Sequence, residues 1–397
     1  MKLPQTAQRI VLKLGTNVVV GGDGALARSR LEGLSLQIAE LWQRERQLLV
    51  VSSGAVGLGR RRLPELANPS RVLTLTEKQV AAAIGQSLLM EAYRGLFGQH
   101  GIETAQILVT AQDFSDRTRY LSLRQTLEKL LQLRVIPIIN ENDVLSTMEL
   151  DEGVYARSFG DNDKLSALVA AKLDADLLIV LTDVDGLYDT NPRTSAAARR
   201  IERITSFEEL AQIRTSGRSL EGRGGMTAKL EAARVASISG VTMLICSGLQ
   251  QNALRCLFDG EETDPLPGTL ILASSPPPKR RQWIGLVAGR FGTVRVNAGA
   301  SQALLSRHAS LLPVGITAVS GEFQPGQVVS IIDEQDREIG RGIAGISSRE
   351  LARVIGLRSD QVRELMGGGT PIEVVHRDNL VILQEHLTDR GPDAQGS

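Results

Sequence analysis

Short runs of aliphatic and β-branched residues alternate with longer helical patterns over the first two thirds of the chain. The predicted strands are Ile10–Leu14, Leu48–Ser52, Thr104–Val109, Val135–Ile139, Leu177–Leu181, Val241–Ile245 and Thr269–Leu272. The predicted helices between them are Arg28–Gln43, Glu77–Phe97, Thr118–Leu131, Lys164–Leu173 and Met226–Ser237. Apolar strands joined by helices indicate an α/β fold, with an open, mainly parallel sheet that helices cover on both faces. In such sheets ligands bind beyond the carboxyl ends of the strands.

A proline-rich segment divides the chain. Residues 274–280 include three consecutive prolines, which cannot continue a helix or a central strand and form a stiff spacer. We therefore expect a first domain over residues 1–273. Residues 281–378 should form a small, mostly β domain, because short strand patterns and two short helical patterns follow the spacer. They are Gly292–Val296, Gln327–Ile332, Glu338–Ile343, Ser347–Ile355 and Ser359–Leu365. The tail, residues 388–397, is predicted to be disordered.

Composition excludes several classes of function. Lys plus Arg and Asp plus Glu both number 45, so the net charge is zero, which argues against a protein that mainly coats nucleic acid or an anionic membrane. The two cysteines have no CxxC spacing and the four scattered histidines form no HExxH motif, so neither a disulfide framework nor a zinc site is indicated. No apolar stretch reaches membrane-spanning length. We expect a cytoplasmic protein without a membrane partner.

The first two predicted strands end in residues suited to an anionic ligand. Lys13 lies in an otherwise apolar strand and needs an anion or a route to solvent. Gly15 would let backbone amides approach that anion, for which phosphate is the natural candidate. A lysine on an edge strand explains the pattern equally well. Ser53 follows the second strand in a G-x-x-G-x-G context, which is not the order of a dinucleotide-binding loop.

Two acidic clusters come later in the sequence. Residues 140–143, Asn-Glu-Asn-Asp, directly follow the fourth strand and suit a ligand that carries an ammonium and a carboxylate, although an Asx-turn is the alternative. Asp161, Asn162 and Asp163 open a helix, where a single N-cap residue would be enough. Acidic side chains at a phosphate site would repel the ligand unless lysines or Mg²⁺ lie between them. This interpretation therefore requires cationic partners elsewhere in the chain.

Two further segments suit nucleotide binding. Thr182 and Asp183 follow the fifth strand. Residues 222–229, Gly-Arg-Gly-Gly-Met-Thr-Ala-Lys, open another helix, and a glycine-rich turn at a helix N-terminus favours anions through its free N–H groups and the helix dipole. Lys229 could reach the same anion. The spacing is not that of a Walker A loop, and a flexible loop before an ordinary helix is the alternative.

The order of these clusters resembles the amino acid kinase superfamily and, in detail, its glutamate 5-kinase family. The matching pieces are VLKLGT, VSSGAV, INEND, FGDNDKLSA, LTDVDGLY and GRGGMTAKL, and the resemblance covers nearly the whole chain. LTDVDGLY is shared across the superfamily, whereas INEND with GDNDxL is particular to the glutamate enzymes. The segment around Ala309–Ile316 is similar to the PUA domain that many bacterial members carry. The other superfamily kinases that act on acetylglutamate, uridylate and carbamate lack that domain.

The resemblance implies an ATP-dependent kinase, with Mg²⁺, that phosphorylates the γ-carboxylate of L-glutamate in the first step of proline biosynthesis. Lys13 and Lys229 would stabilise the transferring phosphoryl group, and Asp163 would orient both lysines. The residues implied to hold glutamate are Ser53, Asn140, Asp143, Asp161 and Asn162. Those implied to bind ATP are Lys13, Gly15, Thr182, Asp183, Arg223, Gly224, Gly225, Met226, Thr227, Ala228 and Lys229. No protein side chain is expected to bind the metal directly.

The resemblance also implies feedback inhibition by proline, a homo-oligomer (dimer or tetramer) and glutamyl phosphate reductase as a partner to consider. Whether the PUA-like domain binds RNA is left open. One alternative interpretation is that the protein mainly binds RNA and that its kinase domain is vestigial. Intact Lys13, Asp163 and Lys229 argue against such decay. A kinase acting on a different acid is the nearer alternative. The sequence departs from the family at Arg223, where threonine is common, and in the longer segment 146–159.

Overall fold

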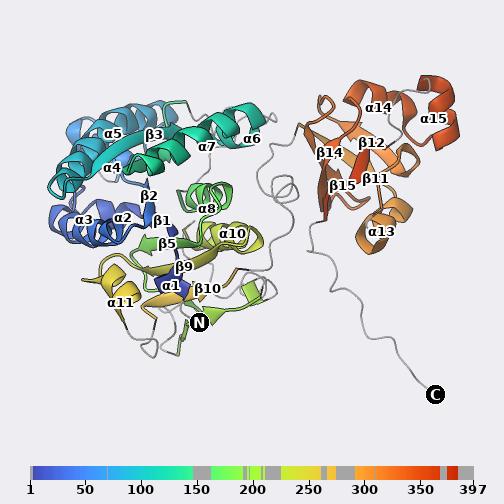
Figure 1. Cartoon of the computed structure of the whole chain (residues 1–397). Coiled ribbons are helices and arrows are strands. Elements are labelled where there is room, and N and C mark those ends of the chain that lie inside the picture. Colours follow the sequence, from blue (N-terminus) through green and yellow to red (C-terminus); the bar gives the residue numbers. More distant parts are fainter. Residues whose placement is uncertain are drawn as a thin grey trace, which may run out of the picture. The chain divides into compact units, whose positions relative to one another are not determined.

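The structure is a computed structural model that describes most of the chain. The described residues are 3–68, 70–145, 162–190, 195, 197–206, 209–210, 225–260, 266–273, 291–307, 309–366 and 373–382. They divide into two compact units, residues 3–273 and residues 291–382 (Figure 1). The predicted linker, residues 274–280, and the predicted tail, residues 388–397, lie outside the described residues, so these boundaries stay predictions.

The first unit is built on an eight-stranded sheet with the order β3-β4-β2-β1-β5-β9-β10-β8. Its strands are β1 Arg9–Leu14, β2 Gln47–Ser52, β3 Glu103–Val109, β4 Val135–Glu141, β5 Leu177–Thr182, β8 Arg203–Ile204, β9 Thr242–Ser247 and β10 Gly268–Ile271. Within these strands, β10 runs antiparallel to β9 and the other neighbours pair in parallel. The predicted mainly parallel sheet is therefore confirmed. Two short strands, β6 Leu187–Tyr188 and β7 Arg200–Ile201, pair separately.

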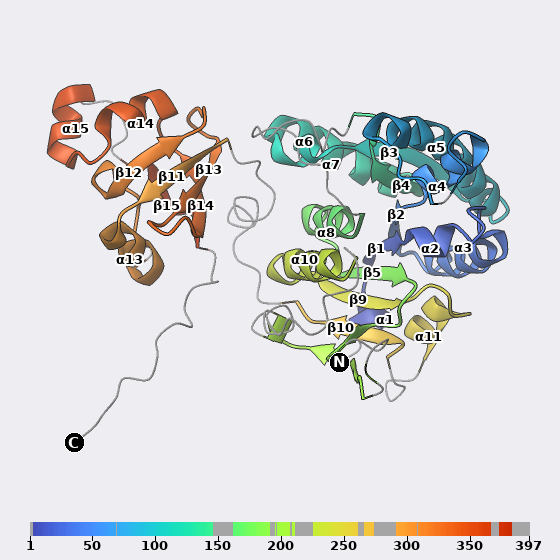
Figure 2. The same cartoon turned by 180° about the vertical axis from the view of Figure 1, so that it is seen from behind.

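Helices cover both faces of this sheet (Figures 1 and 2). On one side lie α3 (Arg28–Gln43), α5 (Leu75–Gly98) and α11 (Ala253–Asp259). On the other side lie α7 (Arg117–Gln132), α8 (Asn162–Lys172) and α10 (Gly225–Ile238). The shorter helices are α1 Leu3–Thr6, α2 Thr16–Val19, α4 Ala55–Arg62 and α6 Ala111–Ser115. This layering brings the N-terminal ends of α8 and α10 to the carboxyl edge of the central strands.

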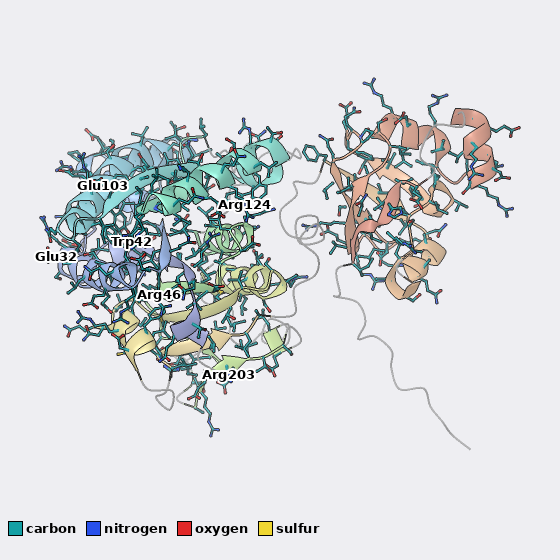
Figure 3. All side chains as sticks on the ribbon, viewed as in Figure 1. Glu32, Trp42, Arg46, Glu103, Arg124 and Arg203 are labelled. Carbon is teal, nitrogen blue, oxygen red and sulfur yellow. The ribbon has the colours of Figure 1, made fainter. Side chains whose placement is uncertain are left out.

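An aliphatic core fills the space between the sheet and the α3 layer. Ile10, Leu12 and Leu14 of β1 are buried in one cluster with residues of α3, α5 and α11. Trp42, labelled in Figure 3, belongs to the same cluster, and the Arg134 guanidinium lies over its ring at 4.0 Å from the centroid. Because side chains alternate along a strand, Lys13 must point toward the opposite face, which α8 covers.

The helices α4 and α5 pack with their backbones in contact. A Cβ atom on Gly85 would lie 1.7 Å from the carbonyl oxygen of Ala55, and one on Gly59 would lie 1.7 Å from that of Ala81. Only glycine permits so close an approach. The sequence analysis predicts no helix here, whereas the glycines of this segment serve the packing of the helix α4. The contact holds α5 against the first residues of α4, which begins two residues after Ser53.

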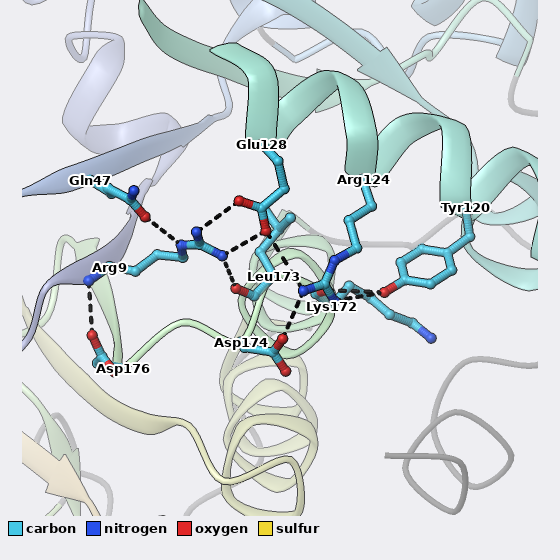
Figure 4. Close-up of polar contacts among 9 residues, drawn as sticks. All are labelled: Arg9, Gln47, Tyr120, Arg124, Glu128, Lys172, Leu173, Asp174 and Asp176. Carbon is cyan, nitrogen blue, oxygen red and sulfur yellow. Dashed lines mark hydrogen bonds and ion pairs between the residues drawn. The ribbon is translucent and has the colours of Figure 1, made fainter. Parts of the chain in front are cut away.

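Two arginines anchor the C-terminal end of α8 (Figure 4). Arg124 of α7 donates from Nη1 to the carbonyl oxygen of Lys172 at 2.7 Å. Arg9 of β1 donates to the carbonyl oxygen of Leu173 and pairs with both carboxylate oxygens of Glu128, at 2.9 and 2.8 Å. Cations at the last carbonyls of a helix satisfy free acceptors and complement the helix dipole. These contacts tie α8 to the neighbouring helix α7 and to β1.

The second unit has a five-stranded sheet with the order β12-β11-β13-β14-β15 and a core of its own. Its strands are β11 Gly292–Val296, β12 Ile316–Ser320, β13 Val328–Ile332, β14 Glu338–Ala344 and β15 Val375–Ile382. Its helices are α13 Ala298–Arg307, the 3₁₀ turn Pro313–Gly315, α14 Ser348–Val354 and α15 Ser359–Met366. The expected small β domain is thus present. Its last strand ends at Ile382, whereas the sequence analysis ends the domain at residue 378.

Candidate active site

Two lysines and one aspartate meet at the carboxyl edge of the central strands. Lys13 Nζ lies 2.5 Å from Asp163 Oδ1, and Lys229 Nζ lies 3.1 Å from Asp163 Oδ2. All three are buried, with exposed fractions of 4% for Lys13, 0% for Asp163 and 8% for Lys229. A buried carboxylate is tolerated when cations pair with it. Because two ammonium groups face a single carboxylate, the cluster keeps one net positive charge, which suits an anionic ligand.

Three different elements bring these groups together. Lys13 comes from β1 and faces α8 through the alternation of strand side chains. Asp163 lies in the first turn of α8, where the positive end of the helix dipole favours a carboxylate. Lys229 lies in α10, which packs against α8. The sequence names all three residues, and the structure joins them in one cluster, although each lies far from the others along the chain.

A network of amide side chains lies beside this cluster. Asn162 Nδ2 lies within hydrogen-bond distance of Ser53 Oγ at 2.9 Å, Asn140 Oδ1 at 3.0 Å and the Ser52 carbonyl oxygen at 3.0 Å. Asn140 Nδ2 donates to Gln86 Oε1 at 2.9 Å. Three residues predicted to hold the substrate, Ser53, Asn140 and Asn162, are therefore brought together. Asn140 lies within β4, which continues to Glu141 because it pairs with β3 there, and not after a strand that ends at Ile139.

Gln86 was missed by the sequence analysis. It comes from the middle of α5 and is 8% exposed, on a buried face with Ala82, Leu89 and Tyr93. A polar residue on the apolar face of a helix is the signal that marks it, because a buried amide needs hydrogen-bond partners. No motif of the family resemblance includes it.

Asp143 lies just beyond β4. Burial raises the pKa of Asp143 to about 6, and the negative charge of Glu141 adds to this effect. A cation that binds beside Asp143 would offset both effects and favour the ionised carboxylate. Its predicted role, to hold the ammonium group of the substrate, stays a prediction, and no hydrogen bond or ion pair in the described residues joins it to the amide network.

Thr182 at the end of β5, Asp183 after it and Asn17 of α2 form a second polar group. Asn17 Nδ2 donates to Asp183 Oδ2 at 2.7 Å, and Thr182 Oγ1 donates to Asp183 Oδ1 at 3.1 Å. Burial alone would raise the pKa of Asp183, but these hydrogen bonds and the charge of Lys229 hold the pKa of that carboxyl below its usual value. A Cβ atom on Gly15 would lie 3.2 Å from the Leu181 carbonyl oxygen, a tight contact, and 3.6 Å from Lys13 Nζ, an ordinary one.

Several predicted ligands remain untested. Asp161, Arg223 and Gly224 lie outside the described residues, as does the segment 146–159. Gly225, Met226, Thr227 and Ala228 form the start of α10, next to Lys229. Their predicted roles in ATP binding stay predictions.

Within the part of the chain that the structure describes, no three His, Cys, Asp or Glu side chains gather where they could hold a metal ion. None of the described helices is long and apolar enough to cross a membrane. The carboxylate at the centre of the site, Asp163, already pairs with two lysines.

The comparisons with known proteins agree with this geometry. The model of the amino acid kinase family matches residues 8–247, a region that contains Lys13, Asp163 and Lys229. Fold and site thus define a protein of the amino acid kinase class, and the predicted fold is confirmed. The PUA domain model matches residues 292–366, within the second unit.

Curated relatives narrow the class. The glutamate 5-kinase of Thermoanaerobacter sp. (strain X514) is 40% identical over 378 residues, covering 95% of this chain and 98% of the relative. The glutamate 5-kinase of Gloeobacter violaceus (strain ATCC 29082 / PCC 7421) is 41% identical over 379 residues, covering 94% and 99%. The chain therefore belongs to the glutamate 5-kinase family. Among solved structures, carbamate kinase from Giardia lamblia bound to AMP-PNP has a TM-score of 0.49 and 18% identity, covering 69% of this chain and 100% of that one.

Proposed function

We propose that the protein transfers the γ-phosphoryl group of ATP to the γ-carboxylate of L-glutamate and so forms L-glutamyl 5-phosphate, the first intermediate of proline biosynthesis. The observation that carries this proposal is the buried cluster of Lys13, Asp163 and Lys229, with one net positive charge beside an amide network. The names of the curated relatives support the choice of substrate.

The reaction needs positioning and positive charge and does not need a base. An oxygen of the γ-carboxylate, already ionised at neutral pH, attacks the γ-phosphorus of ATP. The new O–P bond forms as the bond to the bridging β,γ-oxygen breaks, and ADP leaves with that electron pair. Repulsion between anions is the obstacle, and Lys13 and Lys229 lower it by stabilising the phosphoryl oxygens. Asp163 holds both ammonium groups in place before the substrates bind.

The remaining site residues divide by substrate. Ser53, Asn140, Asp143 and Asn162, with Asp161, bind glutamate, and Asp143 takes its ammonium group. Gly15, Thr182, Asp183 and residues 223–229 bind ATP. Mg²⁺ would come with the ATP phosphates and would supply further positive charge there.

We extend the proposal to regulation and assembly. Proline resembles a cyclised glutamate skeleton, so it can use the contacts made by the α-carboxylate and the amine and inhibit in competition with glutamate. The protein works in the cytoplasm as a homo-oligomer, a dimer or a tetramer. It passes its labile acyl phosphate to glutamyl phosphate reductase.

ADP formation by the purified protein tests the function. With Mg²⁺ and ATP we expect L-glutamate to support turnover, and L-aspartate and N-acetyl-L-glutamate to support little or none. Preference for N-acetylglutamate or aspartate would assign the protein to another carboxylate kinase. Proline added to the same assay should raise the apparent KM for glutamate and leave kcat unchanged.

A further inference from the structure

The amide group of Gln86 has an unused donor inside the protein. Its Oε1 accepts a hydrogen bond from Asn140 Nδ2 at 2.9 Å. Its Nε2 is buried and has no partner in the part of the chain that the structure describes. Leaving a buried N–H group unpaired costs free energy, so native proteins pair such groups with another protein group, with water or with a bound molecule. The bond to Asn140 fixes which way the amide faces.

Asn162 has the complementary unused atom. Its Nδ2 lies within hydrogen-bond distance of Ser53, Asn140 and Ser52, whereas its buried Oδ1 has no partner among the described residues. Asn140 contacts both Gln86 and Asn162, so the unused donor and the unused acceptor belong to one network. A ligand that fills both must offer an acceptor and a donor close together. The carboxylate and ammonium on one α-carbon of an amino acid meet that requirement.

The fold holds Gln86 rigidly at this place. The neighbouring residue, Gly85, packs against the carbonyl oxygen of Ala55 so closely that a Cβ atom would lie 1.7 Å from it. Ala55 begins α4, directly after Ser53 and Gly54. The backbone of α5 at Gln86 therefore cannot move away from the strand end that carries Ser53. A preorganised donor of this kind favours its ligand strongly, because no conformational freedom is lost on binding.

We infer that Gln86 determines substrate specificity by donating a hydrogen bond from Nε2 to the α-carboxylate of the bound amino acid, while Asn162 Oδ1 accepts one from its ammonium group. This inference rests on the proposed function, because it takes L-glutamate as the substrate. It adds a residue from the middle of α5 to a site otherwise made of strand ends and helix starts.

Two variants separate recognition from structure. Gln86→Glu keeps an oxygen that accepts from Asn140 but replaces the donor with an oxygen that repels a carboxylate. Gln86→Met removes the amide at similar volume. Exposed Gln132 of α7 offers the control Gln132→Met. We expect both Gln86 variants to raise the glutamate KM by about tenfold or more, with the KM for ATP unchanged. Gln132→Met should behave as wild type.

Binding to the full-length proteins decides the matter. In calorimetric titrations, L-glutamate should bind wild type and bind Gln86→Glu at least about tenfold more weakly, while the melting temperature without ligand stays the same. 4-Aminobutyrate, which is glutamate without its α-carboxylate, should bind wild type and Gln86→Met equally weakly.

Unchanged glutamate affinity in Gln86→Glu, or an equal loss for both ligands in Gln86→Met, would overturn the inference. If Gln86→Glu does not fold, the glutamate affinity of Gln86→Met decides by the same criterion. Wild-type protein that consumes ATP without responding to glutamate would overturn the proposed function, and the inference with it.

Discussion

At Asp163 one carboxylate faces two ammonium groups, and each lysine depends on it. Lys13 and Lys229 are both nearly fully buried, and Asp163 supplies the opposite charge that a buried ammonium group needs. A phosphoryl group that enters this cluster meets charges that are already desolvated and oriented. Electrostatic stabilisation of this kind acts mainly on the transition state, in which negative charge spreads over the phosphoryl oxygens.

The first prediction concerns these lysines. Lys13→Ala and Lys229→Ala should each lower kcat by about 100-fold or more with little change in the glutamate KM, because the lost charge acts on the transition state. Initial rates at saturating substrates measure this. Lys129→Ala, which changes an exposed lysine of α7, is the matched control. Near-normal kcat in either site variant would remove that residue from the mechanism.

The second prediction concerns pH and Asp143. Because burial and Glu141 raise the pKa of this carboxyl to about 6, it is neutral below that pH and loses its attraction for the substrate ammonium. The value of kcat/KM for glutamate should therefore fall by about tenfold between pH 7 and pH 5. Asp143→Asn should raise the glutamate KM at pH 7 and flatten this profile. Profiles of kcat/KM for ATP at saturating glutamate serve as the control. An equally steep fall there would mean that Asp143 does not act specifically on the glutamate ammonium group.

Residue types alone predict some residues of the site and not others. Lys13 stands out because a lysine in an apolar strand needs an explanation, and Asp163 because three polar residues open one helix. Gln86 did not stand out, because a single glutamine in a long helix resembles a surface residue until the buried face is known. The pairing of Lys13 with Asp163 could not be derived from spacing, since the fold alone brings them together.

At the scale of elements, α8 carries the site at its beginning and is anchored at its end. Arg124 and Arg9 donate to the carbonyl oxygens of Lys172 and Leu173, and Glu128 holds Arg9 in place (Figure 4). The helix is short enough that a shift at one end moves the other. The anchoring pairs therefore contribute to the position of Asp163 without touching the substrate.

The third prediction tests this anchor. Arg124→Gln removes the donor to Lys172 and to Asp174, so it should lower the free energy of unfolding by about 1–2 kcal/mol. Urea denaturation followed by circular dichroism measures it. We expect kcat to fall and the KM for ATP to stay unchanged. Arg94→Gln on exposed α5 surface is the matched control, and an equal loss there would mean that α8 gains nothing specific from Arg124.

The elements themselves were predictable where periodicity was strong. The helix Arg28–Gln43 and the strand Gly292–Val296 match the structure at both ends. The helix α4 was missed because its glycines suggest a loop, although they permit the contact with α5. The strand β15 was missed as well, because His376, Arg377 and Asp378 interrupt its apolar pattern. Tertiary packing decided both cases, and local propensity could not show it.

At the scale of the whole molecule, the two units have separate cores. The second unit buries Val294, Phe323 and Leu351 in a cluster that contains no residue of the first unit. The described residues of the proposed site all belong to the first unit. Folding and catalysis of that unit should therefore not require the second.

The fourth prediction follows from this separation. A chain ending at Ala273 should fold cooperatively and phosphorylate glutamate with a kcat within about twofold of the full chain. Thermal melting and ADP formation measure these properties. Added RNA should leave the activity of the full chain unchanged at physiological salt, because the protein has no net charge. An unfolded or inactive truncation would show that the second unit is part of the catalytic fold.

The path of the carboxylate oxygen tests the proposed reaction most directly. The purified protein is given ATP, Mg²⁺ and L-glutamate labelled with oxygen-18 in its γ-carboxylate, and hydroxylamine is added to cleave the acyl phosphate at its carbonyl carbon. If the γ-carboxylate attacks the γ-phosphorus, the inorganic phosphate released carries an oxygen-18 atom in an amount equal to the ADP formed, and γ-glutamyl hydroxamate accumulates with it. Phosphate without the label, or ADP formation without hydroxamate, would contradict phosphoryl transfer to glutamate.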